Sequence, residues 1–112
     1  MKTGKINILG TVYTVEELGS IEDEALESCD GYCDKTSHRI VVTARDKSCD
    51  LGDFDAYQRK VLRHEIIHAF LFESGLQECW SHNTGHDEAY VDWIACQWPK
   101  IAAVFEQLEC AA

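Results

Sequence analysis

A long stretch without glycine or proline, residues 54–74, is the feature that most constrains how this chain can fold. Asp53 or Asp55 can cap the start of a helix here, and Gly75 follows where such a helix would end. The sequence therefore predicts one long α-helix over this range. Apolar residues occupy most of its circumference: Val61, Leu62, Ile66, Ile67, Ala69, Phe70, Leu71 and Phe72. We expect a helix that is apolar on nearly all sides to be buried on nearly all sides.

Three ionisable residues interrupt this apolar helix. His64, Glu65 and His68 form the pattern His-Glu-x-x-His. Residues four apart lie on one face of a helix, so both imidazoles can reach one metal ion. Glu65 projects to one side, from where it can hold a metal-bound water without binding the metal. Two neutral imidazoles suit Zn²⁺, and a catalytic zinc takes a third protein ligand and keeps one position for water.

Two carboxylates on a second predicted helix are the candidates that complete the site. Glu88 and Asp92 are four residues apart, so they share one helix face. Burying two acids together is costly unless a positive charge lies beside them, and a zinc ion supplies that charge for Glu88. Asp92, one turn along, can accept the free N–H of a ligating histidine.

Other interpretations of these residues remain open. His82 and His86 are alternative ligands or donors to an oxyanion, and Tyr90 is a further oxyanion candidate, although an aromatic residue on a helix is more often part of the core. The two histidines can also be satisfied core residues, with both carboxylates facing solvent. Trp80, Trp93 and Trp98 are expected to be packing residues, with Trp80 a possible wall of the cleft.

Residues outside these helices predict a small antiparallel sheet. Apolar residues around Gly10 indicate a hairpin within the first fifteen residues, and 30–34 and 39–43 indicate two more strands joined by 35–38. The strand 39–44 is the expected exposed edge beside the metal. Residues 20–28 form a loop or short helical turn. The second helix starts near 86, Pro99 breaks or kinks it, and residues 100–109 form a final helix.

Charge and composition exclude several classes of function. Twenty acidic and ten basic residues give a net charge of -10, which disfavours binding to nucleic acids and to anionic membranes. No segment has the roughly 18–20 apolar residues of a membrane helix, and the N-terminus lacks the apolar core of a secretory signal. We therefore expect a cytoplasmic protein. Arg63 is expected to neutralise nearby acids.

Six cysteines occur at positions 29, 33, 49, 79, 96 and 110. In a cytoplasmic protein we expect them to be reduced thiols that serve as small buried residues. Disulfides are an alternative, and a second metal site around Cys29 and Cys33 is a weaker one, since no partner pair at matching spacing accompanies it.

The order His-Glu-x-x-His followed by Glu-x-x-x-Asp on a second helix resembles the gluzincin arrangement of zinc metallopeptidases. The resemblance implies that His64, His68 and Glu88 bind zinc, that Glu65 is the general base and that Asp92 supports His64. Residues 54–105 also resemble small metallopeptidase-like proteins of bacteriophages and mobile elements, which are similar to the ImmA/IrrE group. A bacterial host cytoplasm would then be the location. Met1 is the only methionine, so the metzincin branch, with its methionine turn, is excluded.

These observations predict a single α+β domain spanning residues 1–112. The expected architecture is a minimal zincin: a small antiparallel sheet packed on the long motif helix, a second crossing helix and a C-terminal helix. The expected function is a metallopeptidase with one Zn²⁺ per chain that hydrolyses a protein or peptide substrate. Two alternatives remain: a zinc-binding phage protein that acts as an interaction module without hydrolysis, and a SprT-like DNA-associated protease, which would need a basic face.

Overall fold

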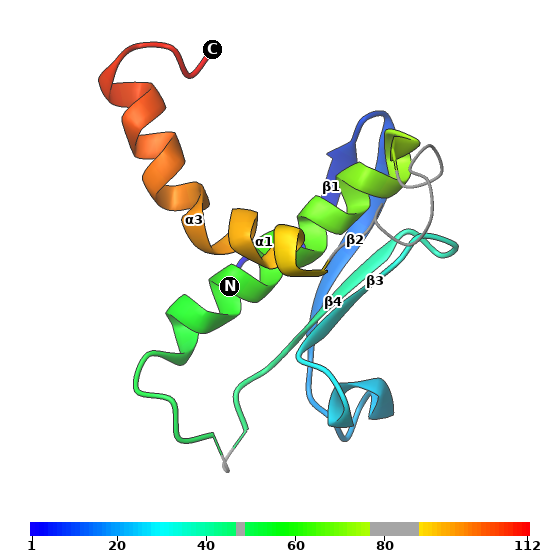
Figure 1. The fold of residues 1–112 in the computed structure, drawn as a ribbon. Helices are drawn as coiled ribbons and strands as arrows, with labels where there is room; N and C mark the ends of the chain where they lie inside the picture. Colours follow the sequence, from blue (N-terminus) through cyan, green and yellow to red (C-terminus); the bar gives the residue numbers. More distant parts are fainter. Residues whose placement is uncertain (47–48, 77–87) are drawn as a thin grey trace.

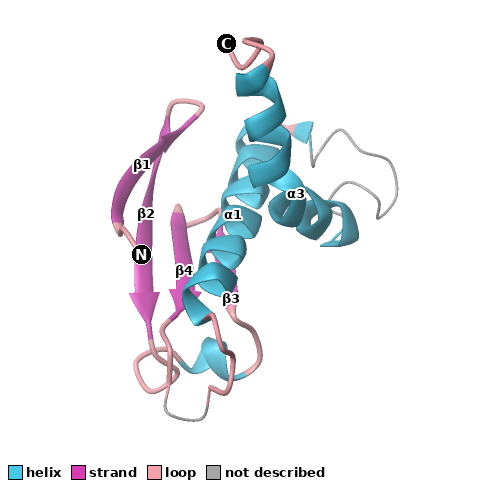
Figure 2. Ribbon diagram, turned by 90° about the vertical axis from the view of Figure 1, so that its left-hand side faces the viewer, coloured by secondary structure: helices cyan, strands magenta, loops and turns pink. Residues whose placement is uncertain are grey.

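The computed structural model describes residues 1–46, 49–76 and 88–112 as an α+β fold. A four-stranded sheet, helix α1 and helix α3 form successive layers, with α1 in the middle (Figures 1 and 2). The elements follow the order β1 (Gly4–Ile8), β2 (Thr11–Leu18), a 3₁₀ helix (Glu24–Glu27), β3 (Gly31–Asp34), β4 (Arg39–Thr43), α1 (Phe54–Glu73) and α3 (Glu88–Gln107). Both strand pairs that were predicted from the sequence are therefore present, as is the short helical turn between them.

The sheet is mixed, whereas the sequence led us to expect an antiparallel one. Its strand order is β1-β2-β4-β3, and the central pair β2 and β4 runs parallel, with Thr14 opposite Arg39 and Leu18 opposite Thr43. The two hairpins are antiparallel, β1 with β2 and β3 with β4. Parallel neighbours need a long connection, and here the chain between β2 and β4 supplies it through the 3₁₀ helix and β3.

The prediction that strand 39–44 is the exposed edge is wrong. β4 lies inside the sheet between β2 and β3, and β3 is the edge strand. Ile40, Val41 and Val42 in β4 are fully buried, as a continuous apolar run is when a strand is covered on both faces. The strand at this edge of the sheet, beside the motif helix, is therefore β3, which is shorter and more polar than β4.

The hydrophobic core lies between the sheet and one face of α1. Residues from three strands and from α1 form it: Ile8, Tyr13, Val15, Ile40, Val42, Val61 and Ala69. The Tyr13 hydroxyl donates to the Glu73 carboxylate at 2.8 Å, which ties the end of α1 to β2. These contacts set the height and rotation of α1 on the sheet.

Helix α1 begins and ends as the sequence predicts, but it is not buried on nearly all sides. The Asp53 side chain accepts from the Ala56 backbone N–H at 3.0 Å, and Gly75 has φ of 77° just after the helix. Phe70, however, is 42% exposed, and Ile66 and Ile67 are only half-buried. The sheet covers one face of α1 and α3 covers part of another, so an apolar strip remains open to solvent.

Helix α3 is one continuous helix through Pro99, so the prediction of a separate C-terminal helix over 100–109 is wrong. Figure 1 shows α3 changing direction along its length, as expected where proline removes a hydrogen bond. Only Val91 and Ala95 of α3 are buried. The expectation that Trp93 and Trp98 are packing residues is wrong, since they are 57% and 47% exposed.

None of the helices in the described part of the chain has the length and apolar character required to cross a membrane. Within the same residues the cysteines at 29, 33, 49, 96 and 110 are free thiols. The expectation that they are buried is wrong, because Cys96 and Cys110 are exposed and Cys29, Cys33 and Cys49 are only half-buried. Cys33 lies on β3, where burial raises the pKa of its thiol to about 12.

Candidate metal centre

Two helices bring three potential metal ligands together. His64 and His68 project from α1, and Glu88 projects from the first turn of α3. The His64 Nε2 lies 2.8 Å from one oxygen of Glu88, and the His68 Nε2 lies 3.0 Å from the other. The two Nε2 atoms are 3.1 Å apart. In the described part of the chain, this is the group of histidine, cysteine and acidic residues whose ligand atoms converge closely enough to hold a metal ion.

The chemistry of this donor set fits zinc. Bonds of about 2.0–2.1 Å to a tetrahedral zinc would place ligand atoms about 3.3 Å apart, slightly more than the 2.8–3.1 Å between these three groups. Reaching that spacing takes an outward movement of a few tenths of an ångström by the exposed Glu88 side chain, and a smaller separation of the two imidazoles. Burial lowers the pKa of His68, which favours the neutral imidazole that binds metals.

Asp92 lies behind His64, one turn along α3 from Glu88. The His64 Nδ1 is 3.2 Å from the Asp92 carboxylate. When Nδ1 carries the proton and donates it to Asp92, Nε2 keeps its lone pair and faces Glu88 and His68. In that tautomer, Asp92 would hold His64 in the orientation that a metal ligand needs.

Lys60 is a member of this arrangement that the sequence analysis did not assign. Its ammonium donates to Asp92 at 3.0 Å, and this hydrogen bond is the main reason that the pKa of Asp92 is lowered. Lys60 precedes His64 by one helical turn, so the two side chains share a face of α1. The spacing of four residues was the sequence signal that could have indicated it.

Arg63 attaches α3 to α1 where α3 bends. Pro99 has no N–H, so it cannot donate to the carbonyl of Ala95, four residues earlier. The Arg63 Nε donates to that carbonyl at 2.7 Å, and Ala95 is fully buried. Arg63, which is next to His64, thus supplies the hydrogen bond that the buried carbonyl of Ala95 would otherwise lack. Arg63 was expected to neutralise acids, and its hydrogen bond instead helps to hold the half of α3 that carries Glu88 and Asp92 against α1.

Glu65 is buried beside the three candidate ligands but is not among them. Only 7% of it is exposed, and burial raises its pKa to about 7. A carboxylate with a pKa near neutrality can both accept and return a proton, which suits a general base. A divalent cation next to it would favour its ionised form.

A cleft runs along both sides of the cluster and along β3. One cavity of about 400 Å³ is lined by Gly31, Cys33, Glu65, His68 and Glu88 among others. A second, of about 200 Å³, shares Gly31, Glu65 and Glu88 and extends to Lys60 and Asp92. The edge strand of the sheet therefore forms one wall of the space in front of the candidate ligands.

Gly31 allows β3 to approach the motif helix. A Cβ at this position would lie 2.9 Å from the Val61 side chain, 3.0 Å from the Val41 carbonyl oxygen and 3.4 Å from the Glu65 Cγ. The first two distances are too short for ordinary contact, and one of the two atoms belongs to the backbone. A side chain here must push β3 away from α1, and with it one wall of the cleft.

We therefore expect Gly31→Ala to lower the free energy of unfolding by about 1–3 kcal/mol, the usual cost of forcing an extra group into a packed contact. Chemical denaturation measures this change. Gly52→Ala is the matched control, because a Cβ there has no neighbour within 4 Å and the variant should unfold like the parent. Equal stability of both variants would show that β3 moves freely relative to α1.

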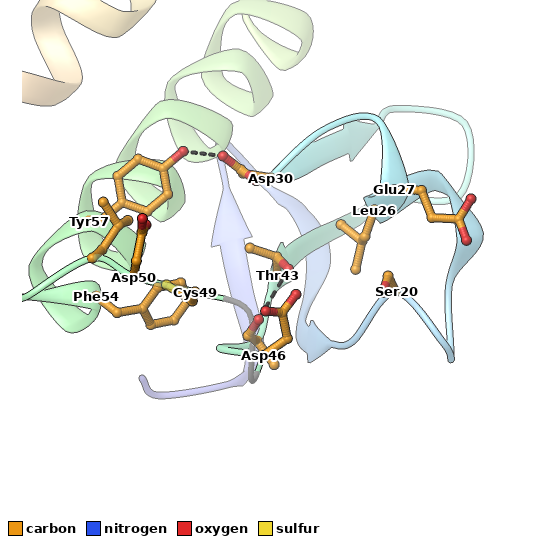
Figure 3. A pocket seen from close by; sticks show the side chains of 12 residues that line it. Ser20, Leu26, Glu27, Asp30, Thr43, Asp46, Cys49, Asp50, Phe54 and Tyr57 are labelled. Atoms are coloured by element: carbon orange, nitrogen blue, oxygen red, sulfur yellow. Dashed lines mark hydrogen bonds between the residues drawn. The ribbon is translucent and has the colours of Figure 1, made fainter.

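A third cavity, of about 480 Å³, adjoins the cleft at Asp30 and Tyr57 (Figure 3). The Tyr57 hydroxyl donates to the Asp30 carboxylate at the boundary between the two spaces. Carboxylates dominate its charged lining: Glu27, Asp30, Asp46 and Asp50. A cationic group would therefore be accepted here more readily than an anionic one. The sequence did not indicate this cavity, since its walls come from α1, β4, the 3₁₀ helix and loops that are far apart in the chain.

The structure separates the remaining candidates. Tyr90 is 67% exposed and lines another hollow with Trp93 and Ile94, so it is neither a core residue nor close to the ligand group. It does not line either of the cavities beside the candidate ligands. His82, His86 and Trp80 lie outside the described residues. Cys29 and Cys33 do not form a metal group within the described part of the chain.

Comparisons with protein-family models, with curated proteins and with solved structures find no match to this chain.

Proposed function

We propose that this protein is a zinc-dependent metallopeptidase with a minimal zincin architecture. The observation that carries the proposal is the convergence of His64, His68 and Glu88 beside a buried carboxylate, Glu65, that none of them needs as a ligand. A purely structural zinc site has no use for a buried base. Asp92 adds the support for a ligating histidine that metal sites commonly have.

In this proposal each residue has a separate task. Bound zinc would lower the pKa of a coordinated water to about 7 and polarise the carbonyl of the substrate. Glu65 accepts the proton of the attacking water at its carboxylate and returns it to the leaving amine. Asp92 retains the Nδ1 proton of His64, so that Nε2 stays available as a ligand. Lys60 keeps Asp92 ionised, which preserves its capacity to accept that hydrogen bond.

An extended peptide is the substrate that suits the cleft. In the described part of the chain, β3 pairs with β4 on one side only, so its outer edge offers backbone donors and acceptors. β3 also lines the cavity that holds Glu65 and His68. A peptide that adds to this edge as a further strand would pass directly in front of the candidate ligands.

A zinc-binding interaction module without hydrolysis is the second candidate. The exposed apolar side chains of α3 favour it, since they provide a contact surface away from the metal centre. Such a module would bind zinc at the same three ligands but would leave peptides intact.

Zinc content and proteolysis together test the proposal. We expect protein purified without added zinc to contain about one zinc per chain by mass spectrometry, and to cleave an unfolded protein such as casein. A chelator should remove both the metal and the activity, and added zinc should restore them. Stoichiometric zinc without cleavage would select the interaction module, and protein that takes up no zinc would exclude both.

A further inference from the structure

Helix α3 exposes a continuous stripe of large apolar side chains. At about 3.6 residues per turn, less than half of the circumference of the helix holds six of these side chains: Tyr90, Trp93, Ile94, Trp98, Val104 and Phe105. We call these six residues the apolar face of α3. Five of them are between 42% and 67% exposed, and Ile94 is half-buried. A stripe of this kind on a soluble domain normally packs against another element.

The apolar face continues onto α1. Ile94 and Trp98 line a hollow of about 490 Å³ together with Ile66, Ile67 and Phe70 of α1. Ile94 also borders the hollow that contains Tyr90 and Trp93. The exposed strip of α1 and the part of the apolar face that precedes Pro99 therefore form one surface, and Val104 and Phe105 extend it along α3.

The extent of this surface is at the upper end of what a monomer usually exposes. An aromatic side chain buries about 150–250 Å² in full, so five half-exposed ones (Phe70, Tyr90, Trp93, Trp98 and Phe105) leave roughly 500 Å² open. Val104 and Leu108, at 51% and 70%, add to this area. The largest apolar patch of a typical monomer is about 300–600 Å², whereas each side of a stable interface buries about 800 Å². The patch thus supplies most of the area that one side of a dimer needs.

The last part of α3 has little to hold it within one chain. After the bend, α3 projects away from α1 and the sheet (Figure 1), and none of its residues from Pro99 to Gln107 is buried. An isolated helix of this length is marginal in water. Packing of its apolar face against another molecule would stabilise it.

We infer that two copies of this chain pair through the apolar face of α3 around a two-fold axis. The six residues of this face carry no charge, so two identical faces are complementary and meet without repulsion. The chain as a whole carries a net charge of -10, which opposes contact between copies over most other surfaces. In a two-fold pair each projecting helix covers the apolar strip of its partner, and the contact closes on itself.

The proposed dimer leaves the candidate metal centre open. Glu88 and Asp92 lie on the side of α3 that meets α1, about half a turn away from Tyr90 and Trp93. Pairing and metal binding therefore use different sides of the same helix. The dimer does not depend on the proposed peptidase function, and either can fail without the other.

Sedimentation equilibrium over about 1–100 μM tests the pairing. We expect a mass of twice the 12.7 kDa of the chain. Trp93→Glu and Phe105→Glu each place a charge in the proposed interface and should raise the dissociation constant at least about 100-fold, because an unpaired charge is costly to bury. Both residues are exposed in the single chain, so both variants should keep the parent's circular dichroism spectrum.

Ala103→Glu is the matched control, since it introduces the same charge at an exposed position on the other side of α3. It should leave the dimer intact. A monomeric parent at 100 μM would overturn the proposal and would assign the apolar face to a different protein. Dissociation by Ala103→Glu to the same degree as by Trp93→Glu would also overturn it, because the contact would then not be specific to this face.

Discussion

Glu65→Gln is expected to abolish most hydrolysis while the protein retains its zinc. Glutamine has the shape of glutamate but cannot accept the proton of the attacking water, and general-base catalysis typically contributes about 10²–10⁴-fold to a rate. Glu65 lies outside the ligand group, so about one zinc per chain should remain. Initial rates on an unfolded substrate and metal analysis of the same preparation measure the two effects.

Thermal unfolding gives an independent readout of the same variant. Burial raises the pKa of Glu65 well above the ordinary value of a glutamate, to about 7, so folding of the metal-free chain favours the protonated form. Ionising the buried Glu65 therefore lowers the free energy of unfolding. This loss is absent at a pH below the pKa of Glu65 in the unfolded chain, and it is complete above pH about 7. Metal-free Glu65→Gln should therefore unfold at the same temperature as the parent or higher at pH 8. Glu106→Gln, an exposed substitution on α3, is the control that should change neither activity nor stability. If Glu65→Gln lost zinc together with activity, Glu65 would be a ligand.

His64→Ala, His68→Ala and Glu88→Ala should each lose zinc, and with it the stabilisation that zinc confers. A ligand that binds only the folded state adds about 4 kcal/mol at a thousandfold excess over its dissociation constant. For a domain near 100 residues this corresponds to at least about 10 °C in melting temperature. We expect the parent to show a rise of this order on addition of zinc and the three variants to show almost none.

Asp92→Asn should have a smaller effect, because Asp92 acts through His64. We expect zinc affinity to fall by about 10–100-fold, as is usual when a residue that supports a ligand is changed. Competition with a chromophoric chelator resolves this range. A Glu88→Ala variant that binds zinc as tightly as the parent would show that the third ligand is another residue, and His86 and Asp92 would be the next candidates.

The spacing of the candidate ligands and the elements that carry them were predictable from the sequence. His64 and His68 face the same way on any α-helix, since a helix repeats every 3.6 residues, and the same holds for Glu88 and Asp92. The start of α1 at Asp53 and its end at Gly75 depend on local backbone chemistry, as do the short turns of the two hairpins. Each of these features is decided within a few residues.

Only the tertiary structure decided how these elements meet. The strand order places β3 and not β4 beside Glu65, since pairing between β2 and β4 depends on a connection that no local pattern specifies. Pro99 leaves the carbonyl of Ala95 without its helical hydrogen bond, and Arg63 of α1 donates to that carbonyl. This contact attaches α3 to α1, and it joins residues far apart in the chain. The sequence likewise predicts that Trp93 and Trp98 pack in the core, whereas both side chains are exposed to solvent in the structure of the single chain. Periodicity shows that a helix has an apolar side, but what covers that side depends on the packing of other elements or of a second molecule.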